Sequence, residues 1–164
     1  MYQKIQAGKL ELYCSVFDIN ILLKEIINNI QQTTSKHTIF FNEKNESLFI
    51  NADSDRIDQV IINMLTNAIK YSPEPGDIFV DSCKKDDKII VSIKDSGIGI
   101  PAADIENIFS RFYRVSGLAS SFSGSGIGLY ISSEIIKQHN GSIWAESKPG
   151  EGSIFYFSLP AMQQ

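Results

Sequence analysis

Residues 57–71 read IDQVIINMLTNAIKY, and this stretch decides how the rest of the chain is arranged. Its apolar residues recur at helical spacing and form one continuous stripe: Ile57, Val60, Ile61, Met64, Leu65, Ala68 and Ile69. Asp53 or Ser54 can cap the start of this helix, and the run from Ser72 to Gly76, which holds two prolines, stops it. The stretch therefore predicts a long amphipathic helix with one face on a core.

Polar residues form a second ridge beside the apolar stripe. Asn63, Asn67 and Lys70 stand at i, i+4 and i+7, and Tyr71 closes the ridge. Asparagine is a mediocre helix former, so two of them at the border of a buried face need a reason. A carboxamide oxygen suits Mg²⁺, and a lysine offers a point charge to the phosphates that Mg²⁺ accompanies. The alternative is a buried asparagine pair that satisfies neighbouring backbone groups.

Hydrophobic patterns on either side of this helix predict further helices and strand pairs. Three strand pairs are expected around polar turns: 38–42 with 48–51, 78–83 with 88–94, and 141–147 with 153–159. Two more helices are expected: 19–30, with Asp18 as its N-cap, and 128–139. Residues 101–112 suggest one or two short helical turns, and 116–125 have the composition of a mobile loop.

Strands in hairpins, with helices between the hairpins, predict an α+β fold. We expect a two-layer sandwich whose mixed, mainly antiparallel sheet carries helices on one face.

Length, charge and cysteine use exclude several classes of function. A chain of 164 residues has the length of one domain, and a net charge of −4 argues against a nucleic-acid or anionic-membrane surface. Two isolated cysteines and two histidines argue against a disulfide framework or a zinc cluster. No apolar run reaches the 18–20 residues or so that cross a bilayer. We therefore expect a cytoplasmic domain that binds any anion at a local site.

Asp95 and two glycine runs are the remaining candidates for a binding site. Asp95 ends an apolar row of its strand, where an unpaired carboxylate is costly and an amino group of a purine is a suitable donor. Glycines 97 and 99 follow it, and glycines 124, 126 and 128 open a helix whose amides could face phosphate. The alternative for each glycine run alone is an ordinary turn. The spacing matches neither the dinucleotide fingerprint nor a P-loop.

Residues 109–114, which read FSRFYR, lie between the two glycine runs. For Phe109 and Phe112 we expect ordinary core packing. Arg114, at the start of the glycine- and serine-rich loop, is the better candidate for a phosphate contact.

Together these motifs resemble the catalytic ATP-binding domain of sensor histidine kinases, within the superfamily of gyrase, heat-shock chaperone and mismatch-repair ATPases. The asparagine box is 63–71, the glycine boxes are 95–100 and 124–129, and the phenylalanine box is 109–112. The turn at 150–153 matches as well, so the resemblance covers residues 18–160 in the expected order. It implies a Bergerat-type fold with a flexible ATP lid over about 115–124. It also implies that residues 1–14 are the tail of a preceding phosphoacceptor helix and 15–164 the catalytic domain.

The resemblance implies ATP and Mg²⁺ as cofactors and assigns roles to individual residues. Asn63, Asn67, Lys70 and Arg114 are the expected catalytic group, with Asn67 as the metal ligand. Asp95 is expected to bind the adenine amino group, and Gly97 and Gly99 to make room for the base. The nucleotide site implied in this way comprises Asn63, Asn67, Lys70, Tyr71, Asp95, Gly97, Gly99, Ile100, Tyr113, Arg114, Gly124, Gly126, Ile127, Gly128 and Leu129.

The same resemblance points to phosphoryl transfer rather than hydrolysis. Hydrolytic relatives carry a glutamate where this chain has Asn63, and an asparagine cannot take a proton from water. Neither His37 nor His139 fits the acceptor motif, so the acceptor histidine is expected on helices outside this chain. Expected partners are those helices and, through the full-length kinase, a response regulator, with no nucleic acid, no direct membrane contact and a monomeric fragment. The alternative is a degenerate nucleotide-binding or protein-interaction module of the same fold.

Overall fold

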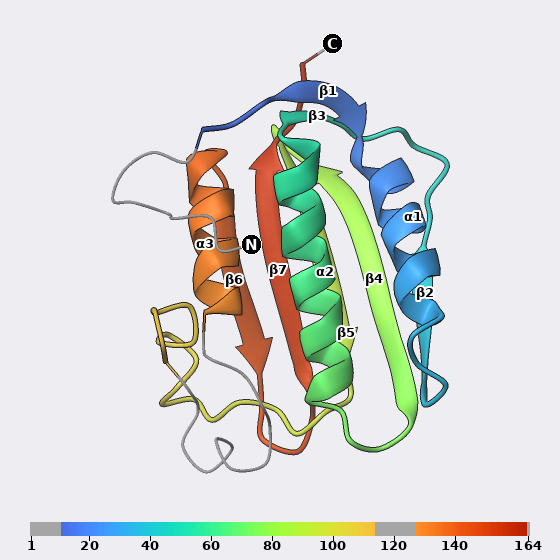
Figure 1. The fold of residues 1–164 in the computed structure, drawn as a ribbon, viewed down its shortest axis with the longest axis vertical. Helices are drawn as coiled ribbons and strands as arrows, with labels where there is room; N and C mark the ends of the chain where they lie inside the picture. Colours follow the sequence, from blue (N-terminus) through green and yellow to red (C-terminus); the bar gives the residue numbers. More distant parts are fainter. Residues whose placement is uncertain (1–10, 114–126, 164) are drawn as a thin grey trace.

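The computed structural model describes residues 11–113 and 127–163, which form a sheet with three helices in front of it (Figure 1). The elements run in the order β1 (Ser15–Asp18), α1 (Ile19–Gln31), β2 (His37–Asn42), β3 (Phe49–Ala52), α2 (Ser54–Lys70), β4 (Gly76–Lys85), β5 (Lys88–Asp95), α3 (Gly128–Gln138), β6 (Ser142–Ser147) and β7 (Ser153–Pro160). The part of residues 1–14 that is described, from Glu11 to Cys14, contains no helix.

The main sheet has five strands in the order β2-β4-β5-β7-β6. The pair β2–β4 is parallel, whereas β4–β5, β5–β7 and β6–β7 are antiparallel. All three helices cover the same face of this sheet, with α1 over β2, α2 over β5 and α3 over β6 and β7 (Figure 1). The predicted α+β sandwich with a mixed, mainly antiparallel sheet and helices on one face is confirmed.

The predicted pairing of residues 38–42 with 48–51 is wrong. β2 pairs with β4 of the main sheet, and β3 pairs with β1 in a separate two-stranded sheet. A parallel pair needs a long crossover, and α2 supplies it between β2 and β4. The two short apolar runs lie close in the sequence, but the connection between them does not form a tight hairpin turn.

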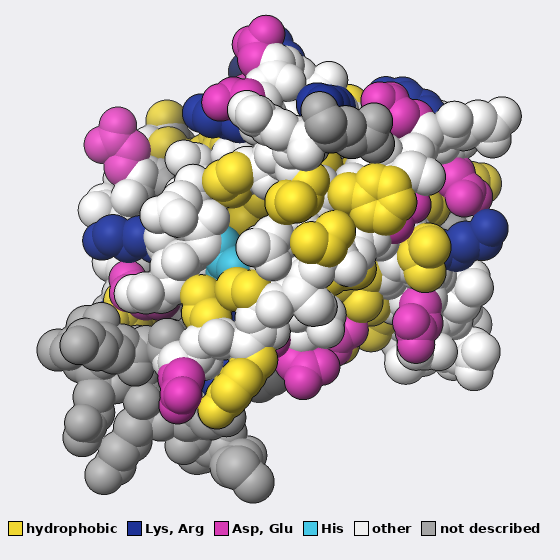
Figure 2. Space-filling view, turned by 90° about the horizontal axis from the view of Figure 1, so that it is seen from above, with side chains coloured by type: hydrophobic (Ala, Val, Ile, Leu, Met, Phe, Trp, Pro, Cys, Tyr) yellow, Lys and Arg dark blue, Asp and Glu magenta, His cyan; other side chains and the backbone are white. Residues whose placement is uncertain are grey.

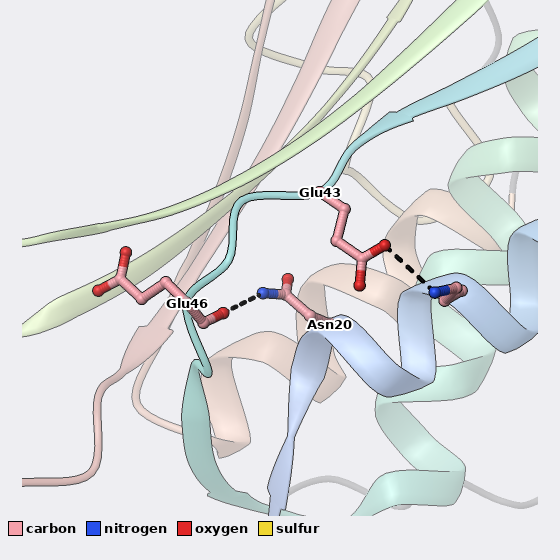
Figure 3. A network of polar contacts seen from close by, with 4 residues as sticks. Asn20, Glu43 and Glu46 are labelled. Carbon is pink, nitrogen blue, oxygen red and sulfur yellow. Dashed lines mark hydrogen bonds and ion pairs between the residues drawn. The ribbon is translucent and has the colours of Figure 1, made fainter.

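Hydrogen bonds from the start of α1 hold the connection between β2 and β3 in place. Oδ1 of Asp18 caps the helix by accepting from the backbone N–H of Asn20 at 2.9 Å, and it also accepts from that of Leu48 at 3.2 Å. Figure 3 shows the Asn20 side chain, whose Nδ2 donates to the carbonyl of Glu46 at 2.9 Å. In the same view Glu43 forms an exposed ion pair with Lys24, at 3.2 Å. The predicted N-cap is confirmed, and these bonds hold the loop against α1.

Helix α2 lies at the centre of the helical layer. The predicted stripe is buried against the sheet and the other helices, apart from half-buried Ile69 at its C-terminal end. Asp53 begins the helix as its N-cap, with Oδ1 accepting from the Arg56 N–H at 3.3 Å. Because the stripe faces the core, the polar ridge with Asn63 and Asn67 is left half-buried at the edge of the layer.

Hydrophobic side chains also gather on the surface at the end where β1 and β3 lie (Figure 2). Among them, Tyr13, Val16 and Phe49 are exposed. Within the described residues, no helix is both long and apolar enough to cross a membrane.

Candidate functional site

Asp95, the last residue of β5, lies buried at the edge of the helical layer with 4% of its surface exposed. Its Oδ1 accepts from the backbone N–H groups of Gly97 at 2.9 Å and Ser153 at 3.3 Å. Burial raises the pKa of this carboxyl above its ordinary value, and the two backbone hydrogen bonds oppose that rise without cancelling it. Among the described residues, Oδ2 makes no hydrogen bond, so it remains an acceptor for a ligand.

The loop after β5 is held against the turn between β6 and β7. The N–H of Gly150 donates to the carbonyl of Ile98 at 2.8 Å, and that of Ile100 donates to Oγ of Ser147 at 2.7 Å. Gly99 has φ of +74°, and a Cβ there would lie 2.0 Å from the Lys148 carbonyl oxygen. A side chain is therefore excluded at Gly99 by the protein's own backbone, a reason for glycine separate from the predicted room for a base.

Gly97 has a different neighbourhood, next to the end of α2. A Cβ at Gly97 would lie 2.2 Å from the Tyr71 carbonyl oxygen and 2.9 Å from Oδ1 of Asp95. The Ile98 N–H donates to that same Tyr71 carbonyl at 3.1 Å. The structure thus brings the first glycine run, Asp95 and Tyr71, at the end of the polar ridge, next to one another.

The polar ridge of α2 has one side chain bound to α3 and one that makes no hydrogen bond among the described residues. Asn63 donates from Nδ2 to Oγ of Ser132 at 3.1 Å. Within the described residues, the half-buried carboxamide of Asn67 makes no side-chain hydrogen bond. The Lys70 Nζ lies 5.2 Å from the centre of the Tyr71 ring, a cation–π distance. Among the described residues, neither the Asn67 carboxamide nor the Lys70 ammonium is used in a side-chain hydrogen bond or ion pair.

The N-terminus of α3 lies against this ridge. Ile127 is the N-cap residue and provides no side-chain hydrogen bond, and the first turn contains no acidic residue. The first amides of a helix have no partner within it, so an uncapped start attracts anions. A Cβ on Gly128 would lie 2.4 Å from Oδ1 of Asn63, which shows how closely the two helices approach.

A groove of about 360 Å³ runs between α2 and α3 beside that contact. It is lined by Asp58, Gln59, Ile62, Asn63, Thr66, Gly128, Ile131 and Ser132. Among the described residues, no cluster of three or more His, Cys, Asp or Glu side chains could hold a metal ion. A divalent cation at this site would therefore depend on amide oxygens and on the oxygens of its ligand.

Several predicted site residues lie outside the described part of the chain: Arg114, Gly124 and Gly126, together with the whole expected lid, 115–124. Ile100, Ile127 and Leu129 are described and half-buried; Ile100 lies in the loop after β5, and Ile127 and Leu129 directly follow the gap. The hydroxyl of Tyr113 donates to the buried Asp104, and this hydrogen bond raises the pKa of the tyrosine.

Residues 101–113 form successive turns rather than a helix. The ring of Phe109 packs edge-on against Phe155 of β7, with 6.3 Å between ring centroids. The expected core packing is wrong for Phe112, which is 56% exposed with a φ of +63°. Its ring instead faces the guanidinium of Arg111, 4.7 Å away. The tight turn carries Phe112 outward, which hydrophobicity alone did not reveal.

Both histidines of the chain are buried and have both ring nitrogens engaged. His37 donates from Nε2 to the Ser72 carbonyl at 2.8 Å and faces the Thr34 hydroxyl with Nδ1, at 3.3 Å. His139 donates from Nδ1 to the Ile135 carbonyl at 2.7 Å, and its Nε2 accepts from the Asp53 N–H at 3.1 Å. Each histidine thus joins parts of the fold that are distant in the sequence: His37 contacts the residue after α2, and His139 contacts the start of α2.

Comparison with known proteins gives consistent matches. Residues 52–163 match the family described as histidine kinase-, DNA gyrase B-, and HSP90-like ATPase. Over 143 residues the chain is 38% identical to the sensor histidine kinase WalK of Bacillus subtilis. This match covers 85% of this chain and 23% of that protein. It is 39% identical over 151 residues to the sensor protein kinase WalK of Staphylococcus saprophyticus, covering 88% of this chain and 24% of that protein. The chain thus spans about a quarter of the length of these relatives.

Solved structures agree with the fold and with the sequence matches. The nucleotide-free catalytic domain of histidine kinase ThkA superimposes with a TM-score of 0.79 and 34% identity, covering 90% of this chain and 97% of that one. Full-length ShkA, solved in complex with AMPPNP, has a TM-score of 0.84 and 25% identity, covering 96% of this chain and 33% of that one.

Proposed function

Because this chain belongs to the histidine kinase-, DNA gyrase B-, and HSP90-like ATPase family, we propose that it binds ATP with Mg²⁺ and donates the γ-phosphoryl group to a histidine. The acceptor lies on helices outside this chain. The observation that carries the proposal is the meeting of three elements: the carboxylate at the end of β5, the polar ridge of α2 and the uncapped start of α3.

The base binds at the Asp95 end of the site. Oδ1 of Asp95 is already used by two backbone N–H groups, which fix the carboxylate in place. Oδ2 then accepts from the 6-amino group of adenine. A side chain at Gly97 would lie 2.9 Å from Oδ1 and 2.2 Å from the Tyr71 carbonyl oxygen, so glycine is needed for the carboxylate to hold this position.

The phosphates bind between α2 and α3. The first amides of α3 donate to phosphate oxygens, and Lys70 places its charge on the same group. The carboxamide of Asn67, which makes no hydrogen bond among the described residues, fits Mg²⁺, which would neutralise developing charge on the phosphates when bound. Arg114, beyond the described residues, is proposed to contact the phosphates as well.

Asn63 favours transfer over hydrolysis. Its amide donates to Ser132 and has no basic group that could take a proton from water. An imidazole acceptor is itself the nucleophile, so positioning and charge neutralisation suffice for transfer to histidine. ATP turnover by this chain alone is therefore expected to be slow.

The partners follow from this role. One structural relative, histidine kinase ThkA, has been solved in complex with the response regulator protein TrrA, with 33% identity and coverage of 92% of this chain and 42% of that one. We propose that the full-length protein likewise serves a response regulator. We place the domain in the cytoplasm, as a monomer that contacts neither nucleic acid nor membrane.

Phosphoryl transfer in trans tests this function. The chain is mixed with Mg²⁺, γ-labelled ATP and the histidine-bearing helices of its full-length protein. We expect label on the helices that acid removes and base does not, and none on helices whose acceptor histidine is replaced by alanine. ATP binding without any transfer would favour the alternative, a nucleotide-binding or protein-interaction module of the same fold.

A further inference from the structure

The hydroxyl of Ser72 is buried without a hydrogen-bond partner in the described structure. Ser72 follows the last turn of α2, and 5% of the residue is exposed. Its Oγ is one of two buried side-chain nitrogen or oxygen atoms among the described residues that lack a hydrogen-bond partner. A buried hydroxyl in this state costs stability, and an alanine would avoid the cost. Interactions within the folded chain therefore do not explain why a serine stands at this position, whereas a hydrogen bond to a ligand would.

The backbone around Ser72 is held from two sides. His37 of β2 donates from Nε2 to the Ser72 carbonyl at 2.8 Å. The neighbouring Tyr71 carbonyl accepts from the N–H of Ile98 at 3.1 Å. These bonds tie the turn to the main sheet and to the loop after β5. The position of the serine is thus fixed relative to the main sheet and to the loop that follows Asp95.

The Ser72 hydroxyl and the Asp95 carboxylate both lie close to Gly97. The point where a Cβ on Gly97 would lie is 2.8 Å from Oγ of Ser72 and 2.9 Å from Oδ1 of Asp95. A Cβ at that point would also lie 2.2 Å from the Tyr71 carbonyl oxygen, so only glycine fits between these groups, and no hydrogen bond joins the two side chains in the described structure. One potential donor and one acceptor therefore stand near each other at the base end of the proposed site.

We propose that Ser72 is a second specificity-determining residue for the nucleotide base, an inference that rests on the proposed ATP function. Asp95 accepts from the 6-amino group, and the Ser72 hydroxyl donates to a ring nitrogen beside that group, directly or through one water. Adenine offers two such acceptors, N1 and N7. Guanine carries an oxygen in place of the amino group, which the carboxylate repels, so the pair selects adenine.

Substitution of Ser72 separates this role from a structural one. Ser72→Ala removes no hydrogen bond of the folded chain, so its melting temperature is expected to equal or exceed that of the wild type. Its affinity for Mg²⁺-ATP is expected to fall by about three- to tenfold, the value of one neutral hydrogen bond. Ser92→Ala is the matched control, because Ser92 lies in β5 and makes no side-chain hydrogen bond among the described residues.

Base analogues then identify the contact. Wild-type chain and Ser72→Ala are titrated with ATP, 1-deaza-ATP and 7-deaza-ATP. The wild type is expected to bind one deaza analogue more weakly than ATP, whereas Ser72→Ala binds that analogue and ATP equally well. Equal discrimination in both proteins, or an unchanged ATP affinity in Ser72→Ala, would overturn the role of Ser72 and leave the proposed function standing. Failure of the wild type to bind ATP at all would instead refute the proposed function.

Discussion

At the scale of single residues, Asp95 is a buried carboxylate whose desolvation lowers the stability of the fold. Its carboxyl is buried at the end of β5, and burial raises its pKa. Both hydrogen bonds that it accepts reach Oδ1, and an asparagine side chain can accept the same two bonds. These two hydrogen bonds therefore do not need the negative charge, and we propose that the charge serves a ligand.

Asp95→Asn should consequently lose binding without losing stability. Loss of a charged acceptor for the 6-amino group is expected to weaken ATP binding at least about tenfold. The melting temperature at pH 7 should stay equal or rise, because a buried charge is removed while the Oδ1 bonds remain. Calorimetric titration and thermal unfolding of the two proteins check this. A strongly destabilised variant would show that the charge is structural.

The raised pKa of Asp95 also predicts two opposite pH effects. The native carboxyl holds its proton to higher pH than the unfolded chain, whose value is near 3.8. The contribution of Asp95 to the free energy of unfolding is thus present below about pH 3.8 and is lost as pH rises through the native pKa. ATP binding needs the ionised form, so affinity should fall as pH drops through the same value.

Denaturant titrations and ATP titrations across this acidic range, each compared with Asp95→Asn, isolate the two effects. The difference in unfolding free energy between wild type and variant should change with pH above 3.8. A difference that stays constant there would contradict the raised pKa.

The residues of the site differ in how far the sequence could reveal them. The ridge of Asn63, Asn67 and Lys70 follows from helical spacing alone, because a single well-patterned helix carries it. Ser72 and His37 could not be found in this way. They lie 35 positions apart, and their contact depends on the parallel placement of β2 beside β4.

At the scale of elements, the start of α2 joins several parts of the molecule. Oδ1 of Asp53 caps the helix, and Oδ2 accepts from the N–H of Tyr13 at 2.9 Å. The Asp53 N–H donates to His139 at the end of α3. The helix that carries the polar ridge is therefore anchored to the segment before β1 and to α3 at one residue.

Asp53→Ala is expected to lower the free energy of unfolding by about 0.5–2 kcal/mol, as the loss of an N-cap does. For a chain of this length that corresponds to a fall of about 1–8 °C in melting temperature. Asp53→Asn keeps a capping oxygen and should lose much less. Thermal unfolding of the two variants provides the comparison, and equal losses would mean that the cap contributes little.

The contact between α2 and α3 predicts a second element-scale effect. A Cβ on Gly128 would lie 2.4 Å from Oδ1 of Asn63, so Gly128→Ala must displace that side chain. We expect weaker ATP binding with the fold retained, since alanine favours a helix by about 1 kcal/mol over glycine. Ser132→Ala removes the Asn63 hydrogen bond without adding an atom and serves as the control. ATP affinity unchanged in Gly128→Ala would place the nucleotide elsewhere.

Strand partners were the part of the fold that local patterns could not supply. The hairpins β4–β5 and β6–β7 are confirmed, since a short polar turn brings each pair together. The four-residue β1 was not predicted, and β3 was assigned to β2 instead of β1. Short strands show too few alternating positions to identify a partner, so long-range packing decides their pairing.

At the scale of the whole molecule, an acidic protein is proposed to bind a highly charged anion. The chain carries a net charge of −4, so its overall field does not attract ATP. Under the proposed function, attraction comes from the local arrangement of Lys70, the start of α3 and a magnesium ion that Asn67 would hold. The metal therefore has a larger part in binding here than it would on a basic surface.

The most direct test of this account is the Mg²⁺ dependence of ATP binding. The chain and its Asn67→Ala variant are titrated with a non-hydrolysable ATP analogue, with Mg²⁺ and with excess chelator. We predict saturable binding by the wild type with Mg²⁺, and a loss of at least about tenfold in affinity on chelation or in Asn67→Ala. Binding that is equally tight in all four cases, or no binding by the wild type with Mg²⁺, would contradict the account.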